Sequence, residues 1–204
     1  MSSRLVVNSV RHTGASADGI TLDASGNVTF PANATCSGTA TGFGGGKVLQ
    51  VVQTVKTDHY SVTNTAVSDI TGMSVTITPS SSSSKVLILV ELQGGDDGNG
   101  YSGFKLIRGS TNIGQSTALD GENANNTQDT AFALMSEQAQ ATYKLNNTSF
   151  NFLDSPSTTS ATTYKLQIVT WTSTTFHLNR PNSIGNARYT MSGTSTITAI
   201  EIGP

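Results

Sequence analysis

The apolar and polar positions between residues 47 and 204 alternate as they do in a series of short β-strands. Residues 73–78 read Met-Ser-Val-Thr-Ile-Thr, so every second side chain is apolar, which is typical of a strand with one buried face. Clusters of Gly, Pro, Asn, Asp and Ser separate such runs and indicate turns. We predict strands near 48–56, 69–78, 85–93, 102–108, 130–136, 149–153, 163–172 and 195–202, with two shorter ones near 112–118 and 175–179.

The number and spacing of these strands predict an all-β fold. Eight to ten antiparallel strands in residues 47–204 fit an antiparallel β-sandwich that is jelly-roll-like. Residues 86–90 (Val-Leu-Ile-Leu-Val) are apolar without a break, which predicts a central strand. Residues 128–141 are compatible with either a helix or a strand, and both readings stay open.

Residues 1–46 form a separate segment that ends in a glycine-rich linker, Gly-Phe-Gly-Gly-Gly, at 42–46. A short strand near 6–10 and a hairpin with its turn at 23–27 are predicted. So few large apolar side chains cannot form a core alone, and the segment therefore needs copies of itself or another protein. The candidate contacts of this attachment and oligomerisation segment are Val6, Val7, Val10, Ile20, Leu22, Val28 and Phe30.

Composition supports the β-rich reading and excludes several classes of function. Charged residues make up only 12% of the 204-residue chain, and Ser and Thr together account for roughly a quarter of it. The net charge is −2 and no Lys/Arg cluster occurs, so we expect no nucleic-acid binding. No apolar run reaches the length of a membrane span, so we expect no membrane insertion. The single cysteine, Cys36, excludes an internal disulfide framework.

No motif of the chain carries recognisable catalytic or metal chemistry. The glycine-rich stretch at 42–47 is one residue too short for a phosphate-binding loop and lacks its final hydroxyl. The acidic stretch at 96–100 (Asp-Asp-Gly-Asn-Gly) offers calcium-type oxygens, but these residue types are also those of an ordinary turn. The three histidines are isolated and no Gly-x-Ser-x-Gly elbow occurs. We therefore expect a protein that is not an enzyme and holds no cofactor.

Aromatic and arginine side chains dominate binding hot spots, and the second half of the chain contains several. They are the candidate receptor contacts, although core burial is the stronger expectation for the tryptophan: Tyr101, Trp171, Phe176, His177, Arg180 and Tyr189.

The chain also resembles a known class of protein. Its N-terminal part is similar to a segment common in tail-fibre and virion structural proteins of marine bacteriophages, above all those that infect cyanobacteria. The similar residues are 7–16 (Val-Asn-Ser-Val-Arg-His-Thr-Gly-Ala-Ser), 20–23 and 26–31. Terminal domains of such proteins resemble the stretches at 46–53, 77–87, 153–156 and 193–202.

The resemblance implies a virion protein that is assembled in the host cytoplasm. Its implied partners are itself, as a homotrimer, other virion proteins of the tail or capsid, and a glycan or protein of the host surface. It implies no catalytic residues. Because the chain is short for a tail fibre, a fibre-like tail or head appendage is the first expectation. A capsid decoration (cement) protein and a tail-borne glycan-degrading enzyme are the alternatives.

Overall fold

A computed structural model describes residues 7–30, 47–63, 66–96, 101–114, 133–136, 143, 145–170, 174–185 and 190–204. The chain divides into two compact units, Met1–Gly44 and Gly45–Pro204. Among the described residues every regular element is a β-strand. A search of this part of the chain finds no helix with the length and apolar character that crossing a membrane requires.

The first unit contains a small antiparallel sheet of β1 (Ser9–Val10), β2 (Ile20–Leu22) and β3 (Val28–Thr29), in that order. The predicted hairpin is confirmed, because β2 pairs with β3 around the turn at 23–27. Asp23 organises this turn: its carboxylate accepts hydrogen bonds from the backbone N–H groups of Ser25 (2.9 Å) and Asn27 (2.8 Å). Gly26 adopts a φ of 85°, which favours glycine.

The second unit consists of strands whose bounds follow the predicted ones closely. They are β4 (Val48–Lys56), β5 (Tyr60–Thr63), β6 (Ser68–Ile77), β7 (Lys85–Asp96), β8 (Tyr101–Arg108), β9 (Thr111–Ile113), β10 (Ala133–Ser136), β11 (Asn146–Asp154), β12 (Thr162–Thr170), β13 (Thr175–Leu178) and β14 (Ser195–Ile202). Strand β5 was not predicted, and β11 begins three residues earlier than expected. Strand β7 continues three residues beyond its predicted end, and β9 ends at Ile113 rather than near 118. The stretch left open at 128–141 contains strand β10, and its other residues lie outside the described part.

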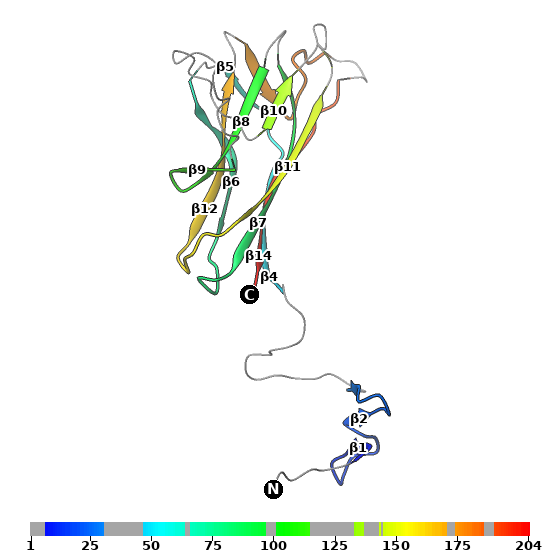
Figure 1. Cartoon of the computed structure of the whole chain (residues 1–204). Coiled ribbons are helices and arrows are strands. Elements are labelled where there is room, and N and C mark those ends of the chain that lie inside the picture. Colours follow the sequence, from blue (N-terminus) through cyan, green and yellow to red (C-terminus); the bar gives the residue numbers. More distant parts are fainter. Residues whose placement is uncertain are drawn as a thin grey trace. The chain divides into compact units, whose positions relative to one another are not determined.

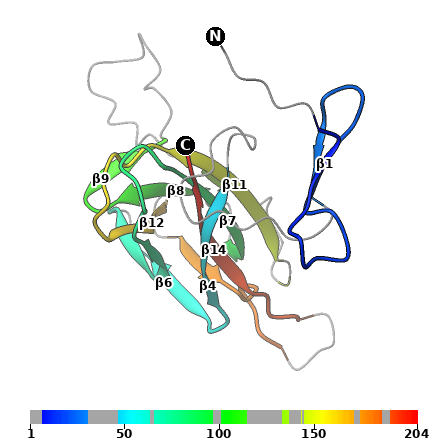
Figure 2. The same cartoon turned by 90° about the horizontal axis from the view of Figure 1, so that it is seen from below.

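These strands form two antiparallel sheets that face one another (Figure 1). One sheet has the order β4-β14-β7-β13-β5, with β11 on the other side of β7, and the second has the order β10-β8-β12-β6, with β9 beside β8. Figure 2 views the sandwich from one end and shows β6, β12 and β8 on one side and β4, β14, β7 and β11 on the other. The predicted all-β antiparallel sandwich is confirmed, and the arrangement is compatible with a jelly roll.

The core lies between the two sheets and uses the inward half of each alternating pattern. In β6, Met73, Val75 and Ile77 are buried, whereas the residues between them are exposed. The rings of Phe104 and Phe176 meet edge to face with centroids 5.4 Å apart. Burial of each large apolar side chain contributes about 1.5–3 kcal/mol before entropy is subtracted. Eighteen such residues join one cluster, so this unit has a core of its own.

Strand β7 is central, as residues 86–90 predicted, because β14 and β11 pair with its two edges. Its two faces nevertheless differ. Val86, Ile88 and Val90 are buried, but Leu89 is 39% exposed. The continuous apolar run therefore indicates a central position within the sheet. It does not indicate burial of both faces, because the outer face of this sheet is open to solvent.

Candidate functional site

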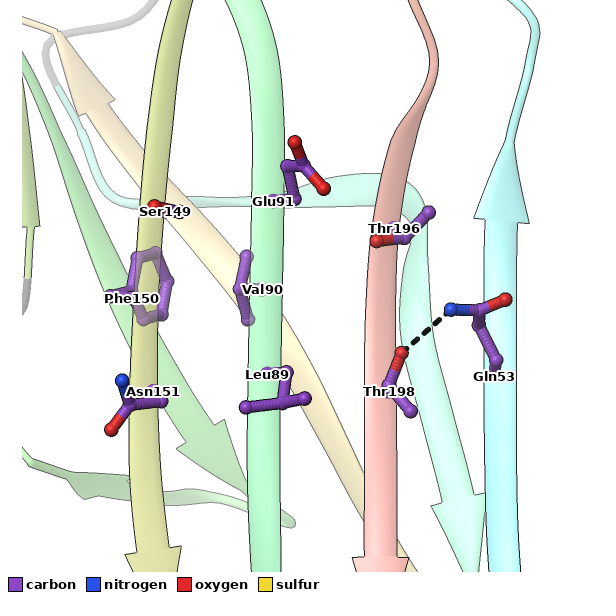
Figure 3. Close-up of a pocket in the computed structure, with 9 residues that line it drawn as sticks. All are labelled: Gln53, Leu89, Val90, Glu91, Ser149, Phe150, Asn151, Thr196 and Thr198. Carbon is purple, nitrogen blue, oxygen red and sulfur yellow. Dashed lines mark hydrogen bonds between the residues drawn. The ribbon is translucent and has the colours of Figure 1, made fainter.

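The outer face of the β4-β14-β7-β11 sheet carries a hollow of about 350 Å³ (Figure 3). Four neighbouring strands contribute to it, and most of the lining side chains bear hydroxyl, amide or carboxylate groups. The lining residues are Gln53, Leu89, Val90, Glu91, Ser149, Phe150, Asn151, Thr196 and Thr198.

Strand register explains why residues so distant in sequence meet here. Thr198 pairs with Gln53 of β4 on one side and with Leu89 of β7 on the other. Directly paired residues of antiparallel strands point to the same face of a sheet. Two adjacent cross-strand rows therefore build the hollow: Gln53–Thr198–Leu89–Asn151 and Thr196–Glu91–Ser149.

Two hydrogen bonds hold the polar rim in place. Gln53 Nε2 donates to Thr198 Oγ1 at 2.9 Å, which Figure 3 marks, and Asn147 Nδ2 donates to Glu91 Oε1 at 3.1 Å. Leu89 supplies an apolar side chain between them. The lining includes one carboxylate and no cationic side chain, so it suits a neutral ligand rich in hydroxyl groups better than an anion.

Next to the hollow runs a fully apolar row across the same four strands. Ile200 pairs with Val51 and with Leu87, and Leu87 pairs with Leu153. Val51 is 58% exposed and Leu153 is 49% exposed. This outer face therefore presents a polar hollow beside an exposed aliphatic strip. We call this strip, which consists of Val51, Ile200, Leu87 and Leu153, the apolar row.

The first unit presents a different surface. None of its described residues, 7–30, is buried, and its large apolar side chains are open to solvent. The exposed ones are Val7, Val10, Leu22, Val28 and Phe30. Of the other predicted attachment contacts, Ile20 is half-buried and Val6 lies outside the described residues.

The predicted receptor contacts in the described part of the chain are mostly covered. Phe176 is fully buried against Phe104, so it belongs to the core and offers no surface to a receptor. Its neighbour His177 is also buried. Arg180 is half-buried and donates to the backbone carbonyl of Asn182 at 3.0 Å. Tyr101 is the first residue of β8, and Trp171 and Tyr189 lie outside the described residues.

Two Ser–His contacts occur among the described residues. His59 Nε2 lies 3.0 Å from Ser192 Oγ at an exposed position, and the other contact joins β5 and β13. Ser61 Oγ lies 2.8 Å from Nδ1 of His177. In a Ser-His-Asp triad the serine bonds Nε2, and Nδ1 is reserved for the orienting carboxylate. The contact pairs two directly opposed residues of β5 and β13 and is explained by strand pairing.

The acidic stretch at 96–100 is described only at its first residue. Asp96 is buried at the end of β7 and accepts a hydrogen bond from Ser102 Oγ at 3.4 Å. Asp97 and the three residues after it lie outside the described part. Within the described residues, no three His, Cys, Asp or Glu side chains are grouped as a metal site would require.

A buried polar cluster joins the two sheets near the ends of β8 and β11. Arg108 Nη1 donates to both carboxylate oxygens of Asp154, at 2.8 and 2.9 Å, and the Tyr164 hydroxyl donates to Oδ2 at 2.6 Å. Burial and the neighbouring Asp154 carboxylate raise the pKa of Tyr164 well above its ordinary value, so it remains a hydrogen-bond donor. These hydrogen bonds tie β8 and β12 of one sheet to β11 of the other.

Comparison with models of known protein families gives no match, and a search of curated proteins also finds none.

Proposed function

We propose that the chain is a non-enzymatic structural component of a bacteriophage virion, a trimeric fibre-like appendage of the tail or head that contacts the host surface. One observation carries the proposal. The described part of the first unit has no buried residue, although it exposes Val7, Val10, Leu22, Val28 and Phe30. Such a unit gains its stability from a partner surface.

The two units support a division of labour. Burial of an exposed valine or phenylalanine contributes about 1.5–3 kcal/mol, so a few such side chains are enough to anchor a short segment. The second unit has its own core and does not need the first to provide one. Attachment through the first unit leaves the sandwich available for contact with the host.

The virion assignment rests on the resemblance of residues 7–16 and of the C-terminal stretches to phage structural proteins. A capsid decoration protein would have the same two units and differs only in where it sits on the particle. The enzyme alternative has less support. Canonical glycosidases use two carboxyl groups on either side of the scissile bond, whereas Glu91 is the one carboxylate that lines the hollow.

We expect antibodies against the sandwich to label particles of a phage whose genome carries this sequence, at the tail or at the capsid. Val28→Asp in the full chain should strongly reduce incorporation, because it places a charge in the exposed apolar set that we assign to attachment. Electron microscopy with gold-labelled antibody gives the location, and immunoblotting of purified particles gives the amount.

The neighbouring substitution Thr29→Asp is the control, since Thr29 is an equally exposed polar residue of the same strand β3. It should leave incorporation unchanged. Particles that carry no copy of the wild-type chain would refute the virion assignment. Equal loss with both variants would refute the assignment of Val28 to the attachment surface.

The full chain should be a homotrimer in solution. Three copies of the first unit can cover one another's apolar side chains, and closed symmetry prevents open-ended association. Multi-angle light scattering should give a mass of about 64 kDa, three times the chain mass of 21.2 kDa. A mass near that of one chain at micromolar concentration would contradict the trimer.

A further inference from the structure

We propose that the hollow on the outer face of the β4-β14-β7-β11 sheet is a binding site for a neutral oligosaccharide. The inference deepens the proposed contact with the host surface and rests on it only for the biological source of the glycan. The site lies on strands β4, β7, β11 and β14, and its lining includes none of the residues that the sequence suggested as receptor contacts.

The polar rim has the hydrogen-bonding groups that sugar hydroxyls require. A hydroxyl both donates and accepts, so it pairs best with planar amides, carboxylates and other hydroxyls. The hollow offers all three kinds: the amides of Gln53 and Asn151, the Glu91 carboxylate, and Ser149, Thr196 and Thr198. Figure 3 shows these side chains projecting from four adjacent strands around Leu89.

The charge of the rim selects a neutral ligand. Glu91 is exposed, carries the one negative charge among the lining residues, and is not balanced by a cationic side chain in the lining. A carboxylate or sulfate group on the sugar would be repelled, whereas a neutral hydroxyl can donate to Glu91. The Asn147 amide already bonds Oε1 of Glu91 and fixes the orientation of the carboxylate.

The aliphatic side chains in and beside the hollow suit the apolar C–H face of a sugar ring. A pyranose has apolar C–H faces between its hydroxyl edges. Leu89 lies within the hollow, and the apolar row of Val51, Ile200, Leu87 and Leu153 borders it one cross-strand row away. A ligand of two or three rings could thus bond the rim with one ring and cover exposed aliphatic side chains with the next.

The size of the hollow favours weak binding at each copy. Its volume of about 350 Å³ is near the lower limit for small-molecule sites, which suits one or two sugar rings. Since Phe150, the one aromatic residue of the lining, is half-buried and not an exposed platform, we expect a millimolar Kd. Several copies on one particle would raise the effective affinity by about 10²–10⁴.

Saturation-transfer NMR with the full wild-type chain tests the site directly. Lactose, maltose and cellobiose serve as neutral probes and 3′-sialyllactose as the anionic one. We expect saturation transfer to at least one neutral disaccharide and a much weaker signal for sialyllactose. Asn151→Ala and Ser149→Ala should each weaken the apparent affinity by roughly tenfold, because each removes one hydrogen-bonding group from an exposed position.

Ser74→Ala is the matched control, since Ser74 is an exposed strand serine on the other sheet. It should leave binding unchanged. The proposal is overturned if none of the three neutral disaccharides shows transfer at tens of millimolar, or if Ser74→Ala weakens binding as much as Ser149→Ala. Particle labelling is independent of these results, so the glycan site can fail while the virion assignment stands, and the reverse.

Discussion

Glu201→Gln is expected to lower the free energy of unfolding by about 2–3 kcal/mol at pH 7. Glu201 lies in β14 with no exposed surface. Its carboxylate accepts hydrogen bonds from Gln50 Nε2 (2.8 Å) and from both the backbone N–H and the hydroxyl of Ser80 (2.7 Å each). Glutamine has the same shape, but its NH₂ group would replace one carboxylate oxygen and face a group that donates, so that donor loses its acceptor.

The same substitution should change the response to acid. Burial alone would raise the pKa of the Glu201 carboxyl, but hydrogen bonds from Gln50, Ser80 and Ser84 outweigh it and lower the pKa from 4.5 to about 2. A lowered pKa in the folded state means that this contribution to stability is complete above the unfolded value. It is lost as the pH falls from about 4.5 to about 2. Glu201→Gln removes this part of the acid sensitivity.

Urea unfolding at pH 7 and pH 3, followed by circular dichroism, measures both effects. Glu91→Gln serves as the control because Glu91 is an exposed strand carboxylate. That substitution should change stability by less than about 0.5 kcal/mol at pH 7. An unchanged urea midpoint for Glu201→Gln would show that the buried carboxylate does not stabilise the sandwich.

The strands could be predicted because the alternation of apolar and polar residues in the sequence matches the alternation of buried and exposed residues in the structure. Met73, Val75 and Ile77 are buried and the residues between them are exposed, as alternation requires. Strand β5 escaped prediction because it has four residues, Tyr60–Thr63, between polar neighbours. Its partner β13 lies more than a hundred residues later, and the pairing that defines β5 is set by tertiary structure.

The hollow could not be predicted because no single stretch encodes it. Gln53, Glu91 and Asn151 each look like the polar half of an alternating strand, and only the register of four strands brings them into two adjacent rows. The sequence instead suggested aromatic residues as the receptor contacts. Phe176 shows why that signal is ambiguous, since a buried core ring and a receptor contact have the same composition.

The lack of a core in residues 7–30 was easier to predict than the hollow. The prediction needs only the number of large apolar side chains and the length of the segment. The absence of buried residues in 7–30 agrees with it. Phe30 and Val28 remain 43% and 51% exposed next to a hairpin that nothing in residues 7–30 covers. A shortage of core can be recognised from composition, whereas a cross-strand row requires knowledge of which strands are neighbours.

Asn179→Ala should be the most destabilising of the substitutions considered, lowering the free energy of unfolding by about 3–5 kcal/mol. Asn179 is fully buried after β13 and joins three parts of the sandwich. Its side-chain amide donates to the carbonyls of Lys56 (2.8 Å) and Asp58 (3.0 Å), and its Oδ1 accepts from Ser195 Oγ at 2.7 Å. Alanine would leave the carbonyl of buried Lys56 and the hydroxyl of buried Ser195 without these bonds.

The backbone of Asn179 adds a second contribution that a pair of variants can separate. Its φ is 62°, in the left-handed region that asparagine tolerates and alanine does not. Asn179→Gly loses the same side-chain bonds without the strain and should be less destabilising than Asn179→Ala by about 1 kcal/mol.

Asn151→Ala, at an exposed strand position, should change stability by less than about 0.5 kcal/mol. Thermal and urea unfolding of the four chains measure these differences. If Asn179→Ala unfolds at the wild-type urea concentration, then the hydrogen bonds of this buried amide do not hold β4, β13 and β14 together.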